Sequence, residues 1–164
     1  MNNMNRKSIV IILIGSILVL VGAAVLVNMT TATPSSGFTA SVIASGALPE
    51  PIGAKFKENG EGFGSGLEVS KIIVAEAMFA PGGTSGWHQH SGPIWVVISS
   101  GNLTLYDESC KPQVYQAPST FFEDGKKTHK AVNEGSEPVK IYITYMLPEG
   151  GVTRIDADDP GTCS

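Results

Sequence analysis

The chain carries little charge and no strongly basic region. Only 16% of its 164 residues are charged, and 11 Lys and Arg against 15 Asp and Glu give a formal net charge of −4. Because no basic cluster is large enough to follow a phosphate backbone, nucleic acid is not an expected partner. The hydrophobic fraction of 42% is too high for a disordered tail, so we expect one folded domain.

No charged residue occurs between Lys7 and Glu50. Residues 8–27 of this gap are almost wholly Ile, Leu, Val, Ala and Gly, and a helix of that length spans about 30 Å, the thickness of a bilayer's hydrocarbon core. With Arg6 and Lys7 in front, the positive-inside rule predicts a cytoplasmic terminus (1–7), a transmembrane signal-anchor helix (8–27) and an extracytoplasmic remainder. The alternative is a signal peptide cleaved near residues 31–33, which would leave a secreted domain.

Cysteine is nearly absent. The two cysteines, Cys110 and Cys163, both lie in the part expected outside the cytoplasm, where oxidising conditions favour disulfides. We therefore predict a Cys110–Cys163 disulfide, with two free thiols as the alternative.

Long amphipathic helices are also missing from the sequence after residue 27. Residues 28–47 are rich in Thr, Ser, Ala and Gly and carry no charge, which predicts a flexible linker before a domain over 48–164. That domain consists of short β-branched and aromatic runs separated by turn residues, which favours an all-β antiparallel barrel or sandwich. The expected strands are Lys71–Phe79, Ile94–Ile98, Leu103–Tyr106, Gln113–Tyr115, Thr120–Phe122 and Val139–Met146.

The chain has only three histidines, and their spacing suggests a metal site. His88 and His90 are two residues apart, so on a strand both imidazoles point to one face. His129 follows another strand-like run and can be brought to them by an antiparallel barrel. Neutral imidazoles suit divalent Zn, Cu, Fe and Ni and, less strongly, Mn. On spacing alone, a lone histidine such as His129 is more often an ordinary surface or hydrogen-bonded residue than a metal ligand.

The sequence around these histidines resembles the cupin superfamily. The run from Gly82 to Gly101, with His88 and His90 inside it, is similar to the first cupin motif, and His129 to Asn133 is similar to the second. The resemblance extends over about residues 71–145 and is closest to small bacterial single-domain exported cupins. It implies a double-stranded β-helix (a jelly-roll barrel) with His88, His90 and His129 as metal ligands. It also implies that pairing of barrels into a homodimer is plausible.

Two departures from the cupin pattern concern the metal ligands. The glutamate that usually follows the histidine pair would align with Ile94 or Trp95, so the usual carboxylate ligand is missing. In the second motif Glu123 replaces a usual proline, and either Glu123 or Asp124 could supply a carboxylate instead.

Two classes of function are compatible with such a site, an enzyme and a non-catalytic binding module. Three neutral imidazoles leave the metal its 2+ charge, which favours a small anionic substrate. The resemblance allows a dioxygenase-like enzyme, while the lack of a recognisable general base favours a non-catalytic module that binds or senses a metal or small ligand. No catalytic residue is assigned. The side chains expected to line a pocket are Trp87, Trp95, Tyr106, Phe122 and Asn133, with Phe121, Tyr142 and Tyr145 as further aromatic candidates.

Overall fold

The computed structural model describes residues 32–58, 61–161 and 163, and within them the chain is all-β without a helix. No helix that could cross a membrane occurs in this part, and residues 1–31, which include the expected transmembrane segment, lie outside it. The strands are β1 (Ser36–Glu58), β2 (Glu61–Thr84), β3 (His88–Gln89), β4 (Ile94–Ser100), β5 (Asn102–Asp107), β6 (Gln113–Gln116), β7 (Ser119–Glu123), β8 (His129–Val132), β9 (Val139–Leu147) and β10 (Ile155–Asp156).

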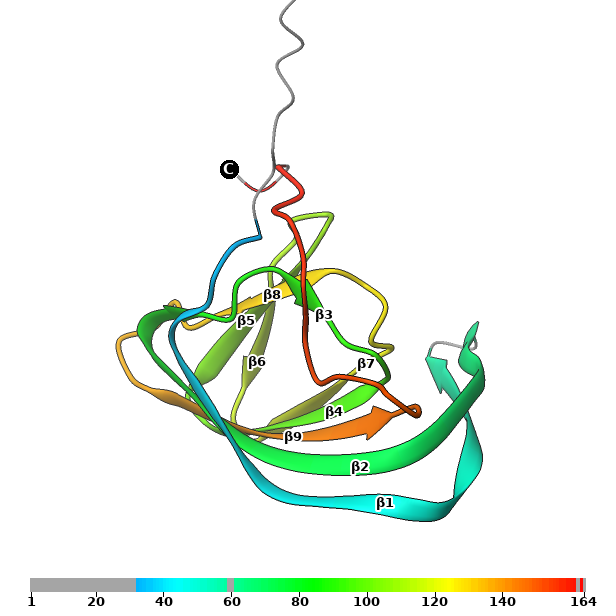
Figure 1. The fold of residues 1–164 in the computed structure, drawn as a ribbon. Coiled ribbons are helices and arrows are strands. Elements are labelled where there is room, and N and C mark those ends of the chain that lie inside the picture. The colour runs from blue at the N-terminus through cyan, green and yellow to red at the C-terminus, as the bar shows by residue number, and fades with distance from the viewer. Residues whose placement is uncertain (1–31, 59–60, 162, 164) are drawn as a thin grey trace, which may run out of the picture.

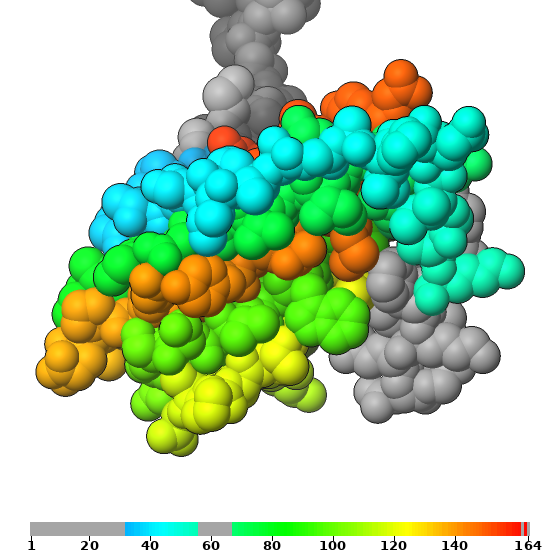
Figure 2. Space-filling model, turned by 90° about the horizontal axis from the view of Figure 1, so that it is seen from below, coloured from blue at the N-terminus to red at the C-terminus, as the bar shows by residue number. Residues whose placement is uncertain are grey.

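The strands form one strongly curved sheet that closes into a nearly complete barrel (Figure 1). The neighbour order is β10-β3-β8-β2-β9-β4-β7, with β1 on β2 and with β5 between β8 and β6. The long strand β2 joins both halves, because residues 71–79 pair with β9 and Thr84 pairs with β8. This arrangement is consistent with a double-stranded β-helix. Figure 2 shows β1, β2, β9 and β4 side by side on the outer face.

The core forms inside the barrel because residues of the central strands alternate between the two faces. Burial alternates without interruption along β9, and along β4 the buried residues Ile94, Val96 and Ile98 alternate with exposed Trp95 and Val97. All six strands expected from the sequence are confirmed, and β2 continues beyond the expected run at both ends. Gly101 makes the β4–β5 turn with φ of +78°, where a Cβ would meet Pro138 and Val139 at 2.9 to 3.1 Å.

The linker expected over residues 28–47 is wrong from Ser36 onward. Residues 36–47 belong to β1, which pairs antiparallel with β2 in a register that includes Ala40↔Ala77. Phe38 packs against Phe79 of the core, but beyond it the backbone ladder rather than side-chain burial holds this strand, since Val42 and Ile43 are 63% and 57% exposed. A strand without a continuous inward apolar face leaves no alternation for the sequence to reveal. The folded domain therefore begins before residue 48.

The predicted disulfide is confirmed. Cys110, in the turn between β5 and β6, is bonded to Cys163 near the C-terminus, with a Cα–Cα distance of 5.2 Å. It ties the end of the chain to the barrel, and the described residues contain no free cysteine.

Candidate metal centre

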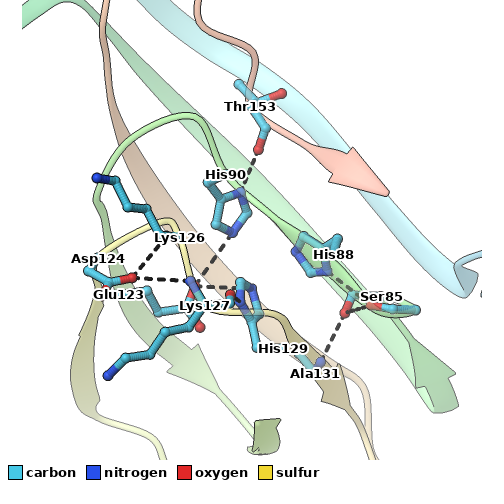
Figure 3. A network of polar contacts seen from close by, with 11 residues as sticks. Ser85, His88, His90, Glu123, Asp124, Lys126, Lys127, His129, Ala131 and Thr153 are labelled. Carbon is cyan, nitrogen blue, oxygen red and sulfur yellow. Dashed lines mark hydrogen bonds and ion pairs between the residues drawn. The ribbon is translucent and has the colours of Figure 1, made fainter. Parts of the chain in front are cut away.

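The three histidines lie together inside one end of the barrel (Figure 3). His88 is in β3, His90 follows it directly, and His129 begins β8, where it is the register partner of His88. Only 5 to 7% of each residue is exposed, and one ligand nitrogen from each lies within 4.8 Å of the others. The ring centroids are 4.3 to 5.0 Å apart. The structure thus brings together all three histidines singled out in the sequence.

Each imidazole is oriented by a backbone carbonyl that accepts a hydrogen bond from its Nδ1. The Nδ1 to oxygen distances are 2.9 Å from His88 to Gly86, 2.5 Å from His90 to Thr153, and 2.9 Å from His129 to Lys127. Because a carbonyl can only accept, Nδ1 carries the proton in each neutral ring, and the lone pair is on Nε2. Metal-binding histidines are held in this tautomer by the same kind of outer partner.

Glu123, the last residue of β7, supplies a carboxylate to this cluster. Its Oε2 lies 3.2 Å from Nε2 of His129 and 3.5 Å from Nε2 of His90, and its side chain is 11% exposed. Glu123 is the cross-strand partner of Ile94. Directly opposed residues of paired strands point to the same face. The Glu123 carboxylate, on β7, therefore lies beside Ile94 of β4, one of the two positions with which the usual cupin glutamate would align.

Asp124, the other carboxylate considered, does not take part. Its Oδ1 accepts the backbone N–H groups of Lys126 and Lys127 at 2.9 and 3.3 Å, so it shapes the turn before His129 (Figure 3). In the same turn Gly125 has φ of +87°, and its carbonyl accepts the His90 N–H at 2.8 Å. The turn therefore positions two of the histidines.

Burial keeps His88 and His129 neutral. Desolvation, reinforced by His129 and His90, lowers the pKa of His88 to about 2. Desolvation also lowers the pKa of His129, although the neighbouring Glu123 opposes the shift. Burial raises the pKa of Tyr145 to about 12, so its phenol, which lies beside His90, keeps its proton.

Because the ring of His129 is neutral, its Nε2 and the Oε2 of Glu123 are two hydrogen-bond acceptors that face each other. Nε2 of His90 and Oε1 of Glu123 are buried without a hydrogen-bond partner among the described residues. Acceptors gathered in this way need a cation or an additional proton, because burying them unsatisfied is costly. The four side chains accordingly fit a divalent cation bound by three nitrogens and one oxygen.

A small apolar cavity adjoins the cluster in the barrel interior. Its volume is about 40 Å³, which leaves room for water or a ligand of a few atoms. Besides the histidines, Glu123 and Ser85, it is lined by apolar and aromatic side chains: Phe38, Phe79, Leu103, Leu105, Phe121, Ala131, Ile141, Ile143 and Tyr145.

The expectation that Trp87, Trp95 and Phe122 line this cavity is wrong. Strand alternation explains the error at Phe122, because its neighbour Phe121 points inward from β7, whereas Trp87 lies at the bend before β3. Trp95 is 46% exposed and packs on Phe122 on the outer face, with ring centroids 5.2 Å apart. Trp87 is fully buried, but it lies beneath Lys130, whose Nζ is 4.9 Å from the ring centroid.

Tyr106 and Asn133 are also absent from the cavity lining. The Tyr106 hydroxyl donates to Oε1 of Glu134 at the surface. The fully buried Asn133 amide donates to the carbonyls of Phe79, Ala80 and Glu137 at 2.8 to 3.1 Å. Asn133 therefore fixes the segment after β8 to the end of β2. Tyr142, one of the further aromatic candidates, also lies outside the lining, whereas Phe121 and Tyr145 are part of it.

Replacing Asn133 by Ala should destabilise the protein without removing a metal ligand. The change leaves three buried or partly buried carbonyls without this donor, so we expect the free energy of unfolding to fall by about 2 kcal/mol. Urea unfolding measures the loss, and elemental analysis of the folded variant should show unchanged metal stoichiometry. Loss of metal from a fully folded variant would contradict this structural role.

The comparisons with known proteins agree with the fold and the motifs. Residues 75–145 match the model of the Cupin_2 family, described as a cupin domain, and this range contains all three histidines and Glu123. The all-β barrel encloses three neighbouring histidines that could hold a metal ion. Residues 75–145 therefore form a cupin domain. No curated protein matches the chain.

Several solved structures are similar at low sequence identity. A conserved protein of unknown function from Streptococcus pyogenes is 16% identical, with 47% of this chain and 65% of that chain covered and a TM-score of 0.42. The polyketide cyclase RemF from Streptomyces resistomycificus is 14% identical, with 54% and 64% covered and a TM-score of 0.46. The chain thus covers less than two thirds of either one. An uncharacterised Klebsiella pneumoniae protein with a double-stranded β-helix domain is 17% identical, with 70% and 90% covered and a TM-score of 0.47.

Proposed function

We propose that the protein binds one divalent transition metal through His88, His90, His129 and Glu123. The observation that carries this proposal is the 3.2 Å approach of Oε2 of Glu123 to Nε2 of His129, two buried acceptors with no proton between them when the ring is neutral. A metal would replace this unfavourable contact by two coordinate bonds. Three nitrogens and one carboxylate oxygen are compatible with Fe, Mn, Zn, Cu or Ni.

The charge of this ligand set favours an anionic ligand. From the histidines alone we expected the metal to keep its full 2+ charge, whereas Glu123 reduces the sum to about +1. A small anion would neutralise the remaining charge in the apolar cavity, where ions interact strongly. The volume of about 40 Å³ restricts such a ligand to a few atoms unless the barrel opens.

The enzyme candidate is a dioxygenase-like oxidoreductase acting on a small anionic substrate. A bound redox-active metal would supply the oxygen chemistry. The contribution of the chain is to bind and enclose: apolar side chains exclude water, and the Tyr145 phenol, with its pKa raised to about 12, holds a proton beside His90. Oxygen consumption by the iron-loaded protein with thiols, diketones and small carboxylates tests this candidate.

The alternative is a module that binds or senses a metal or small ligand without turnover. It is favoured by the small cavity, whose titratable lining residues are the three histidines, Glu123 and Tyr145. With four of these committed to the metal, only a phenol remains, and at its raised pKa it is a poor general base. Metal binding without oxygen consumption across the substrate panel would favour this alternative.

We further propose that residues 8–27 anchor the protein in the membrane and that its folded domain lies outside the cytoplasm. The uncharged run behind Arg6 and Lys7 supports an anchor, and the Cys110–Cys163 disulfide fits an oxidising compartment. A secreted form released by cleavage is the alternative. Membrane fractionation together with protease treatment of intact cells distinguishes the two, because only an anchored protein sediments with membranes and is digested from outside.

Elemental analysis tests the metal site directly. The full chain, purified without a His tag, is compared with the variant in which His88, His90 and His129 are all Ala. We expect about one equivalent of a transition metal in the parent and none in the variant. If neither protein retains metal after loading with Fe, Mn, Cu, Ni and Zn, the proposed function is wrong.

A further inference from the structure

The C-terminal strap, defined as residues 152–163, holds the segment that carries two of the proposed ligands. In its strand β10, Ile155 pairs with Gln89 and Asp156 pairs with His88. The next residue, Ala157, donates its N–H to the carbonyl of Trp87 at 3.1 Å. The strap is thus the β-neighbour of the segment that contains both His88 and His90, as Figure 1 shows for the orange-red chain beside β3.

The strap also orients one ligand directly. The Thr153 carbonyl accepts the hydrogen bond from Nδ1 of His90 and so fixes the tautomer that presents Nε2 to Glu123 (Figure 3). Next to it, Ser91 and Val152 exchange two hydrogen bonds, Ser91 N–H to the Val152 carbonyl at 3.2 Å and Val152 N–H to Ser91 Oγ at 2.9 Å. The ring of His90 therefore depends on the strap for its orientation.

The other supports of the ligand segment hold its backbone and Gln89 but not the His90 ring: the Trp87 N–H donates to Thr33 Oγ1, and Gln89 Nε2 donates to Thr128 Oγ1, both at 2.8 Å. Strand β3 has two residues, and its pairing with β8 is the single position His88↔His129. The His90 backbone N–H is held by Gly125, but this bond leaves the ring free to rotate. Without the strap, the backbone would stay near its place while the Nε2 of His90 lost its fixed direction.

The Cys110–Cys163 disulfide closes the strap onto the barrel. Cys110 donates its N–H to the carbonyl of Asp107 at 2.9 Å, and Asp107 is the register partner of His129 in the β5–β8 pair. One covalent bond therefore links the segment that supports His88 and His90 to the strand that supports His129. Apart from it, the described end of the strap is held to the N-terminal segment by the bridge Ala32↔Asp158.

We propose that the Cys110–Cys163 disulfide controls metal affinity by holding the C-terminal strap against the histidine segment. This inference rests on the proposed metal site. Reduction by a dithiol breaks the S–S bond and moves two electrons and two protons to the cysteine sulfurs, while the dithiol becomes a disulfide. The freed chain end then frays, as chain termini without an anchor do, and His90 loses the Thr153 carbonyl. Loss of such an outer partner lowers metal affinity by about 10- to 100-fold.

The test measures the Zn²⁺ affinity of the full chain by competition with a chromophoric chelator. The oxidised protein is compared with protein reduced by a phosphine, which takes an oxygen from water and delivers the two electrons. We expect the affinity to fall by about 10- to 100-fold on reduction. In the oxidised protein His90→Ala should weaken binding strongly, and in the reduced protein it should add little, whereas His129→Ala should weaken binding in both.

Two variants separate this explanation from others. Cys110→Ser/Cys163→Ser has no thiols, so it should bind Zn²⁺ as weakly as the reduced protein and should not respond to the phosphine. Ala157→Pro removes the N–H that bonds to Trp87 while the disulfide is kept, and it should also weaken binding. Far-UV circular dichroism of each protein should retain the β spectrum.

The possible failures are distinguishable. If the oxidised protein binds no metal, the proposed function and this inference both fail. If oxidised and reduced proteins bind Zn²⁺ equally, only the inference is wrong. If reduction weakens binding but the double serine variant binds normally, the thiols themselves have altered the metal binding, and the strap does not control it.

Discussion

Replacing Glu123 by Gln is expected to lower the affinity for a divalent transition metal by at least about 100-fold and, at the same time, to stabilise the metal-free protein. The loss of affinity follows because a charged oxygen ligand becomes a neutral amide, a change larger than the loss of an outer partner. The gain in the metal-free state follows because the new amide N–H group donates to Nε2 of His129, which the carboxylate only faces. One additional buried hydrogen bond contributes about 1 kcal/mol.

Asp124→Asn is the matched control for this prediction. It makes the same change of carboxylate to amide one residue away, on a side chain that keeps an oxygen for the N–H groups of Lys126 and Lys127. We expect it to leave the metal affinity within about 3-fold of the parent. Competition with a chelator gives the affinities, and urea unfolding in chelator gives the stability of the metal-free proteins. Equal affinities of the parent and Glu123→Gln would exclude Glu123 as a ligand.

The sequence predicted the ligands from the chain's own periodicity and from the motifs around it. Alternation along a strand places His88 and His90 on one face, and the cupin-like contexts added His129. The same alternation, applied to neighbours, would have excluded Phe122 from the cavity, since it adjoins Phe121, which points inward. The assignment of Trp87 and Phe122 as lining residues followed their aromatic character instead of their position in the fold.

The remaining parts of the site depend on contacts between distant segments. Glu123 reaches the histidines because β7 pairs with β4 in a register that places it opposite Ile94, and one sequence does not reveal that register. The sequence therefore predicted only that either Glu123 or Asp124 could be the carboxylate ligand. The Thr153 contribution was missed altogether, because a backbone carbonyl has no side-chain signature.

In the fold, too, some strands could be predicted from the local sequence and others could not. Strands with an inward apolar face, such as β4 and β9, are visible as alternating runs. Strand β1 has one inward aromatic residue, Phe38, and no continuous apolar face, and it is held mainly by its ladder with β2, so its composition suggested a linker. Strands β3 and β10, of two residues each, form only where the C-terminal strap meets the histidine segment. Their short length gives no periodic signal.

Acidification should destabilise the metal-free protein from about pH 6.5 downward. The pKa of His88 is about 2 in the folded protein and near the ordinary imidazole value of 6.5 in the unfolded chain. Below the unfolded value, the unfolded state binds a proton that the folded state does not bind, so the free energy of unfolding falls by about 1.4 kcal/mol for each pH unit. At pH 4.5 this amounts to about 3 kcal/mol from His88. His129, whose pKa is also lowered, adds a loss of the same sign.

The variant His88→Asn isolates this contribution, because the asparagine amide can donate to the Gly86 carbonyl as Nδ1 does and has no proton to gain. Urea unfolding in chelator at pH 7.5, 6.5, 5.5 and 4.5 should show a slope in the variant smaller by about 1.4 kcal/mol per pH unit below pH 6.5. The carboxylates with lowered pKa values, Glu76 and Asp107, begin to lose their stabilising contribution as the pH approaches 4.5, but this loss is the same in the parent and in the variant and cancels in the difference between their slopes. A parent protein whose stability is flat from pH 7.5 to 4.5 would mean that these imidazoles bind protons equally in both states, so their burial could not keep Nε2 free for a metal.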